Sequence, residues 1–255
     1  QLPITHFKPA EIGTSITELK NMGYDKDIHD NELTNPEQVV ELKTQDIILP
    51  KCEDAPELGS DKILYKLSLF IDELLASFYN IKKFYNLKHE TDLIGHLVVA
   101  LAPHTSAGIV GRIIGFSKTQ GFFAHPLFHA ATRRDCDGDE ASVTLLMDAL
   151  LNFSRQFLPD SRGSTQDAPL VITSILIPTE VDDMAFDLDI ADRYPAEFYE
   201  ATQHFELPWN VKIDRFANIL NSDSEYTNIS CTHPVGNINA GVKCSSYKIL
   251  PSMED

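Results

Sequence analysis

Three aspartates at alternate positions, Asp135, Asp137 and Asp139, are the residues of this chain best suited to chemistry. In an extended strand or a tight loop, side chains at i, i+2 and i+4 point the same way. Three carboxylates on one face repel one another unless a cation lies among them, and Mg²⁺ prefers oxygen ligands of this kind. Gly138 lets the backbone turn between the second and third acids. The pattern indicates a metal site; a solvated acidic turn is the alternative that the spacing leaves open.

The acid cluster follows a segment that carries only positive charge. Residues 93–134 contain no Asp or Glu, yet they include Arg112, Lys118, Arg133 and Arg134. The two arginines beside the acids are suited to clamp phosphate groups through charge-assisted hydrogen bonds. Arg112 and Lys118 are candidates for contacts with nucleic-acid phosphate, with plain surface solvation as the alternative for Lys118. A buried apolar segment would also lack acids, and the arginine pair has charge balancing as its alternative.

Other chemical motifs fit the sequence poorly. An EF-hand loop that starts at Asp135 needs Gly and Glu where the chain has Glu140 and Leu146. His125 and His129 have the spacing of a zinc-binding helix, but no third ligand follows at a typical spacing, so core or hydrogen-bonding histidines are the better interpretation. A nucleophile elbow, a Walker loop and a dinucleotide-binding glycine motif are all missing from the sequence.

Composition limits the class of protein. The chain has 255 residues, 43% hydrophobic and 23% charged, which is ordinary for a globular protein, and its formal net charge is −17. A net charge of this sign repels nucleic acid on average, so the local charge of the basic segment at 93–134 is more informative than the net charge of the chain. The four cysteines are far apart, which favours a reduced, cytoplasmic protein. The sequence shows no membrane span or secretory leader, and the first residue is Gln1, so we expect an excised piece of a longer protein.

The elements that must position these residues can be outlined from periodicity. Apolar residues at helical spacing predict a helix that begins near Ser60 or Asp61. The remaining expectations, by residue range, are one or two strands within 37–50, a short helix or strand at 92–103, glycine-bent strands at 104–134, an amphipathic helix at 142–159, a buried strand at 168–178, an exposed acidic stretch at 180–192, and a helix at 195–205.

Several long segments resemble one family, the large catalytic subunit of the archaeal D-family DNA polymerase. The most specific match runs from His125 to Glu140 and includes HPLFHAATRRDCDGDE. The other matching segments follow in the order of the family, at residues 41–50, 93–116, 125–159, 167–178, 194–202 and 238–255. Because several long matches in order are far more specific than one acidic motif, the resemblance covers nearly the whole chain.

The resemblance implies an α+β fold that forms part of a double-psi β-barrel polymerase core with flanking helices. It divides the chain into a mixed region at 1–90, a catalytic barrel segment at 91–178 with the metal-binding loop and the following helix, and an α/β extension at 179–255 that continues outside this sequence. The family core resembles that of multisubunit RNA polymerases, in which two such barrels face each other. The opposing barrel and a zinc-binding C-terminal region would lie outside this chain.

The resemblance also implies a reaction, the templated addition of deoxynucleotides to a primer 3′-hydroxyl by two Mg²⁺ ions, for which Mn²⁺ can substitute. Asp137 and Asp139 match the family's metal-binding aspartates, and Asp135 occupies a position where we expect Asn in most members. As a third carboxylate, Asp135 can add a ligand or add repulsion. Smaller departures are Thr132, where we expect Lys, and Ala141, where we expect an acid.

Substrate and nucleic-acid contacts are expected at Arg133, Arg134, Arg112 and His129. The implied partners are primer-template DNA, deoxynucleoside triphosphates, a small subunit with 3′–5′ exonuclease activity that completes a heterodimer, and a sliding clamp reached through other regions. No membrane partner is expected. Three rival functions stay open at this point: an RNA polymerase-like enzyme with the same loop, a non-catalytic assembly fragment or inactive paralogue, and a Mg²⁺-dependent nuclease or phosphatase.

Overall fold

The structure is a computed structural model that describes residues 1–55, 58–102, 107–133, 141–151, 171–181, 183–191, 193–220, 229–230, 237–241 and 243. Seven strands form one mixed sheet in the order β1-β7-β4-β6-β5-β8, with β9 paired to β6. These strands are β1 (Leu2–Pro3), β4 (Asp46–Pro50), β5 (Leu97–Leu101), β6 (Ala107–Ser117), β7 (Phe123–Ala124), β8 (Ser142–Leu145) and β9 (Val171–Thr173). A separate ribbon pairs β2 (His6–Phe7) with β3 (Val40–Glu41).

Helices surround this sheet. The α-helices are α1 (Pro9–Ile12), α2 (Ile16–Asn21), α3 (Ser60–Ser77), α4 (Pro126–Ala131), α5 (Leu146–Leu151), α6 (Ala196–Gln203) and α7 (Phe216–Ile219). Short 3-10 helices lie at Glu90–Leu93, Pro178–Glu180, Asp183–Asp187, Pro208–Asn210 and Ile238–Ala240. In the described part of the chain, none of the helices combines the length and apolarity needed to cross a membrane.

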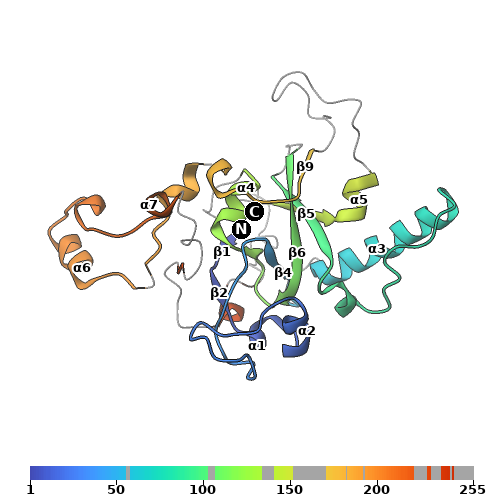
Figure 1. The fold of residues 1–255 in the computed structure, drawn as a ribbon, viewed down its shortest axis with the longest axis horizontal. Coiled ribbons are helices and arrows are strands. Elements are labelled where there is room, and N and C mark those ends of the chain that lie inside the picture. The colour runs from blue at the N-terminus through green and yellow to red at the C-terminus, as the bar shows by residue number, and fades with distance from the viewer. Residues whose placement is uncertain are drawn as a thin grey trace, which may run out of the picture.

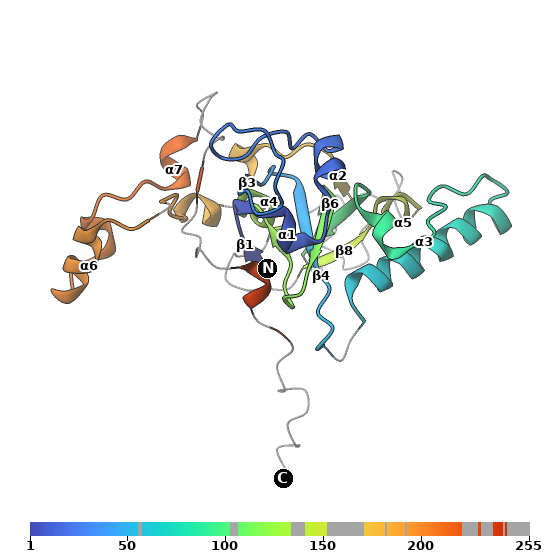
Figure 2. The same cartoon turned by 90° about the horizontal axis from the view of Figure 1, so that it is seen from below.

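The sheet lies at the centre, and two arms extend from it in opposite directions (Figures 1 and 2). Helix α3 projects on one side and the segment with α6 and α7 projects on the other, while α1 and α2 lie together near the chain start. Strands from residues 1–90 and from 91–178 enter the same sheet, and the three-part division of the chain stays a prediction.

The central strands are buried on both faces. Adjacent residues of β4 point to opposite sides: Ile47 packs in one apolar cluster with Ile113 and Val98, and Ile48 packs in another with Ile114. This two-sided burial explains why β4 and β6 are runs of apolar residues without polar alternation. The overall class, mixed α and β, agrees with the α+β expectation.

Glycine allows α1 to approach the sheet closely. At Gly115 in β6, an added Cβ would lie 2.7 Å from both the Cβ and the carbonyl oxygen of Ile12 at the end of α1. The pairing of β4 with β6 shifts register at the same place, between Ile47 and Ile48. The end of α1 therefore packs directly against the backbone of β6.

Helix α3 confirms the prediction of a helix that begins near Ser60. Leu64, Ile71 and Leu75 are buried along one face, as a 3.6-residue period requires. At its far end, the carboxylate of Asp72 accepts hydrogen bonds from the backbone N–H groups of Phe84, Tyr85 and Asn86 at 2.9, 2.9 and 2.7 Å. These three bonds fasten the returning chain to the helix.

Three secondary-structure predictions were wrong in part. Residues 142–145 form β8 instead of the start of a helix, because they pair with β5, and only residues 146–151 are helical before the described range ends. Of the described residues in the strand expected at 168–178, only residues 171–173 form a strand, β9, and its two end residues are exposed where we expected burial. The glycine-rich segment forms β6 and β7 as expected, but it also contains α4, which starts at Pro126.

Residues 237–241 return from the far end of the sequence to α1. The side chain of Asn239 donates to the carbonyl oxygen of Glu11 at 2.8 Å and accepts from the backbone N–H of Lys118 at 2.7 Å. The backbone N–H of Ile238 donates to a carboxylate oxygen of Glu11 at 3.3 Å. The short segment therefore joins α1 to the end of β6.

Candidate active site at the acid segment

The predicted metal ligands Asp135, Asp137 and Asp139 lie outside the described residues, together with Arg134. We call residues 134–140 the acid segment. The structure does describe what leads into it, α4 with Thr132 and Arg133, and what leads out of it, Ala141 and β8. Among the described residues, no three His, Cys, Asp or Glu side chains gather into a metal-binding group.

Both flanks of the acid segment are held at the same end of β5. Before the segment, the carbonyl oxygen of Thr132 accepts a hydrogen bond from the N–H of Ala102 at 3.2 Å. After the segment, Ser142 pairs with Leu101 in the antiparallel ladder of β5 and β8. The acid segment therefore starts and finishes beside one strand end, on a frame of regular structure.

Thr132 is the most tightly anchored of the flanking residues. Its side chain is fully buried. The hydroxyl of Thr132 donates to the carbonyl oxygen of His129 at 2.6 Å, and the hydroxyl oxygen accepts from the side-chain amide of Gln1 at 3.0 Å. The hydroxyl at the position where the resemblance leads us to expect lysine thus points into the protein and fixes the end of α4.

Both histidines of α4 are buried, which confirms their interpretation as core residues. The Nδ1 atom of His125 accepts a hydrogen bond from the N–H of Leu127 at 3.2 Å and caps the helix. The ring of His129 packs edge-on against Phe122, with 5.0 Å between centroids, and neither of its ring nitrogens has hydrogen-bond geometry to another described residue. Desolvation by burial lowers the pKa of His125 to about 4 and that of His129 to about 3. Both rings are therefore neutral near pH 7.

The expected contact between His129 and substrate needs correction. Its side chain has no exposed surface in this structure, so its ring packs against Phe122 in the interior, where a substrate would not reach it.

Arg133 is the exposed cation at the entrance to the acid segment. Its φ angle of 62° places it in the left-handed region, and its N–H donates to the carbonyl oxygen of Ala130 at 2.9 Å, which ends α4. A positive φ is unusual for a residue with a side chain, and here it turns the chain out of the helix. Arg133 makes no ion pair with another described residue.

Arg133 also lines a cavity of about 400 Å³ between the start of β6, the end of α4 and the segment after β9. This volume lies in the range of small-molecule sites. The walls combine apolar and small residues with charged groups, among them Gly108, Ala131, Leu176, Glu180 and Asp183. The cavity therefore places one guanidinium and an apolar wall next to the first residue of the acid segment.

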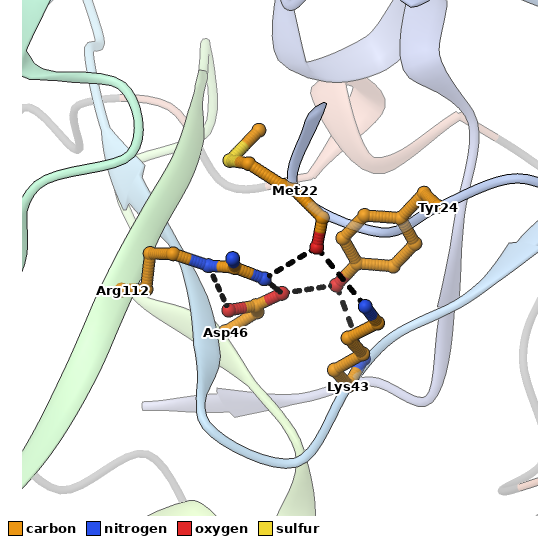
Figure 3. A network of polar contacts seen from close by, with 5 residues as sticks. All are labelled: Met22, Tyr24, Lys43, Asp46 and Arg112. Atoms are coloured by element: carbon orange, nitrogen blue, oxygen red, sulfur yellow. Dashed lines mark hydrogen bonds and ion pairs between the residues drawn. The ribbon is translucent and has the colours of Figure 1, made fainter. Parts of the chain in front are cut away.

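Arg112 has a different environment from the one we expected (Figure 3). Its Nε and Nη2 atoms donate to the two carboxylate oxygens of Asp46 at 2.8 and 2.7 Å, and Nη2 also donates to the carbonyl oxygen of Met22 at 3.1 Å. The hydroxyl of Tyr24 donates to the same carboxylate at 2.5 Å. Burial, together with the charge of Asp46, raises the pKa of Tyr24 well above its ordinary value, so the hydroxyl remains a donor.

This network gives Arg112 a structural role, and its expected contact with phosphate stays a prediction. Two of its guanidinium nitrogens are committed to protein acceptors, and its partner Asp46 is almost fully buried. Arg112 therefore joins β6 to β4 and to the N-terminal helices. Sequence reasoning missed Asp46, Tyr24 and Gln1, because their partners lie 22 to 131 positions away and no local pattern marks them.

A comparison with protein families finds one match over the whole chain. The family model described as "DNA polymerase II large subunit DP2, catalytic domain" matches residues 1–255.

Individual relatives agree with this match. The chain is 53% identical to the DNA polymerase II large subunit of Archaeoglobus fulgidus, over 100% of this chain and 22% of that protein. It is 51% identical to the protein of the same name from Pyrococcus furiosus, over 99% of this chain and 20% of that protein. The one from Methanocella arvoryzae is 47% identical, over 100% and 22%. The chain thus spans about a fifth of the length of these relatives.

Proposed function

Because the chain belongs to the DNA polymerase II large subunit family, as its catalytic domain, we propose that it performs template-directed DNA synthesis as part of a longer large subunit. The reaction transfers a nucleotidyl group from a deoxynucleoside triphosphate to a primer 3′-hydroxyl. The observation that carries this proposal is the frame of the acid segment, whose two flanks are held by Ala102 and Leu101 at one end of β5.

The donor set of the acid segment suits divalent cations. Asp135, Asp137 and Asp139 supply only carboxylate oxygens, and Gly138 between them relieves backbone constraint. We assign two Mg²⁺ ions to these aspartates, with Mn²⁺ as a substitute. When bound, such ions lower the pKa of the primer hydroxyl and neutralise charge on the pyrophosphate that leaves.

The residues of the chain itself bind and orient the substrate. Arg133 is exposed and lines the cavity, and Arg134 follows it in the sequence, so we assign both to charge-assisted contacts with the triphosphate. The apolar wall around Leu176 offers a surface for the base or the sugar. Thr132 and the neutral His125 and His129 keep α4 fixed beneath these groups.

The finer architecture and the partners belong to the same proposal. Parallel pairing of β4 with β6 and of β1 with β7, across long connections, supports a double-psi β-barrel. The partners are primer-template DNA, a small subunit with 3′–5′ exonuclease activity and a sliding clamp reached through other regions, in the cytoplasm. Membership of the family is the support for these assignments.

The test uses the full-length large subunit with its small subunit in a primer-extension assay. Asp137→Asn and Asp139→Asn should each lower synthesis by at least about 100-fold while binding of primer-template DNA persists, because ligands for charge stabilisation are lost. Asp30→Asn, at an exposed aspartate, is the matched control. Mn²⁺ titration by calorimetry should show weaker binding in the double variant.

Other outcomes would contradict the proposal in distinguishable ways. Preference for ribonucleotides would indicate an RNA polymerase-like enzyme, and hydrolysis without templated synthesis would indicate a nuclease. Unchanged synthesis and metal binding in Asp137→Asn would show that the acid segment is not catalytic. Asp135→Asn distinguishes the two roles open to Asp135. Weaker Mn²⁺ binding would identify Asp135 as a third ligand, and tighter binding would show that its charge repels the other two carboxylates.

A further inference from the structure

The far end of α3 exposes a group of large apolar side chains. We call residues 78–84, where the chain leaves α3 and turns back, the α3 tip. The exposed fractions of its side chains are 72% for Phe78, 47% for Tyr79, 55% for Ile81 and 56% for Phe84. The tip lies at the end of the arm farthest from the sheet (Figures 1 and 2). Exposed apolar side chains grouped within a few residues are a feature of interaction sites.

These side chains are held outward by a well-ordered backbone. The N–H groups of Phe78 and Ile81 donate to carbonyl oxygens of the last helical turn, those of Leu74 and Leu75, each at 3.0 Å. The buried carboxylate of Asp72 then fixes the chain where it returns, through the N–H of Phe84 and its two successors. A fixed turn that exposes aromatic rings loses little conformational freedom when it binds a partner.

Charge at the α3 tip is positive, in contrast to the chain as a whole. Lys82 and Lys83 are exposed and form no ion pair with any described residue. Residues 78–88 contain three lysines and no Asp or Glu. The chain has a formal net charge of −17, so the α3 tip and the residues that follow it are a local reversal of sign.

A second exposed aromatic group among the described residues has mainly acidic neighbours. On the opposite arm, Phe205 and Trp209 are exposed by 93% and 73%. Glu206 lies between them in sequence, and Glu197 and Glu200 precede them on α6. Aromatic surface there is accompanied by acids, which repel phosphate; at the α3 tip it is accompanied by lysines.

We propose that the α3 tip binds the unpaired template strand of DNA. Aromatic side chains stack on unpaired bases of any sequence, and lysines beside them contact the phosphates. Phe78, Tyr79 and Phe84 supply the rings, while Lys82 and Lys83 supply the charge. A protein partner would need carboxylates to match the two unpaired lysines, whereas a nucleic-acid strand carries anionic groups along its whole length. This inference rests on the proposed function, because it assumes a DNA template.

The base of the tip is connected to the frame of the acid segment. The hydroxyl of Tyr85 accepts a hydrogen bond from the N–H of Met147 at 3.1 Å. Met147 belongs to α5, which follows β8 directly. The buried ring of Tyr85 thus connects the α3 tip, where the DNA strand would bind, to α5 and β8, which follow the acid segment.

The test measures DNA binding by the full-length large subunit with its small subunit, by fluorescence anisotropy. The probes are a primer-template with a 5′ single-stranded overhang and a blunt duplex of the same length. Lys82→Glu/Lys83→Glu and Phe78→Ser/Phe84→Ser should each weaken binding of the overhang probe by about ten-fold. The lysine variant should also reduce the salt slope by about 1.4, the value for two contacts with a single strand. Blunt-duplex binding should change by less than two-fold, on the order of measurement error.

Matched controls lie elsewhere on the surface. Lys26→Glu removes an exposed lysine that pairs with Asp30, and Trp209→Ser removes an exposed ring beside acids; both should bind the overhang probe like the wild type. Unchanged overhang binding in both tip variants would overturn the inference. So would an equal loss on the blunt duplex, or a benzoylphenylalanine in place of Tyr79 that crosslinks to protein and not to DNA.

Failure of the inference and failure of the proposed function give different results. Overhang binding through the tip by a protein that makes no DNA would refute the function and support the inference. Normal DNA synthesis together with unchanged overhang binding in the tip variants would support the function and refute the inference.

Discussion

The backbone N–H of Ala102 donates to the carbonyl oxygen of Thr132 across 3.2 Å, at the end of β5 and the entrance to the acid segment. One position earlier, Leu101 pairs with Ser142 at the exit of the segment. The site is therefore supported from both flanks by one strand. The side chain of Thr132 contributes the second part of this support, since it is buried and hydrogen-bonded to both His129 and Gln1.

Thr132→Val should destabilise the 255-residue chain by about 1–2 kcal/mol, because the change keeps the shape but removes the hydroxyl that accepts from Gln1 and donates to His129. Urea unfolding measures the effect. Thr132→Ser keeps the hydroxyl and should recover most of the loss. Equal destabilisation by both variants would show that the methyl group, and not the hydrogen bonds, matters.

Asp46→Asn should destabilise the chain by about 2–3 kcal/mol, because it leaves the partly buried guanidinium of Arg112 without a charged partner. Its control is Asp30→Asn at the exposed pair with Lys26, which should change stability by less than about 0.5 kcal/mol. The comparison is made by urea unfolding at pH 7. A small effect of Asp46→Asn would argue that Arg112 is available for other contacts.

Acidification from pH 7 to pH 5 should weaken the fold. The pKa values of His125 and His129 are lowered by burial to about 4 and about 3, from an ordinary value of 6.5. Between pH 6.5 and these lowered values the unfolded state binds protons that the folded state does not, so stability falls as pH falls. The loss at pH 5 is about 2 kcal/mol for each ring.

His129→Leu removes one of these rings from a site without hydrogen-bond partners among the described residues, and should reduce the acid-induced loss by about 2 kcal/mol. His29→Leu, at an exposed histidine, should leave it unchanged. The measurement is the free energy of unfolding in urea at both pH values. A pH dependence that persists in full in His129→Leu would refute the assignment.

Gly115→Ala should cost about 2–3 kcal/mol, because the new methyl group would meet Ile12 at 2.7 Å on both its side chain and its backbone. Gly13→Ala is the matched comparison: φ is 70° there but no atom lies within 4 Å, so only the backbone cost of about 1 kcal/mol is expected. Thermal unfolding of both variants separates packing from conformation, and equal losses would contradict the close approach of α1.

Local patterns predicted the elements that depend on local interactions. The apolar period of α3 and the proline before α6 correctly located both helices. Residues 142–145 behave differently, because Val143 and Leu145 fit either a helix or a strand, and their pairing with Ala100 and Val98 decides. The exposure of Phe70 and Phe78 could not be predicted either, because periodicity does not show where a helix extends past the core that it packs against.

The candidate site divides in the same way. The acid cluster and its neighbouring arginines are recognised from residue type and spacing, so the sequence alone points to them. The roles of Arg112 and His129 depend on Asp46 and Phe122, and only the fold brings these residues together. Charge identified Arg112 as a cation, but it did not reveal the buried acid that neutralises it.

The return of Asn239 to Glu11 has a consequence for the order in which the protein acquires its structure. Residues 11 and 239 are 228 positions apart, so Glu11 is synthesised well before its partner, and β1 likewise waits for β7. Contacts of such long sequence separation slow folding. A nascent chain that has reached residue 220 still lacks the segment that joins α1 to the end of β6. We therefore expect the N-terminal helices to gain full protection from hydrogen exchange only after synthesis has passed residue 241.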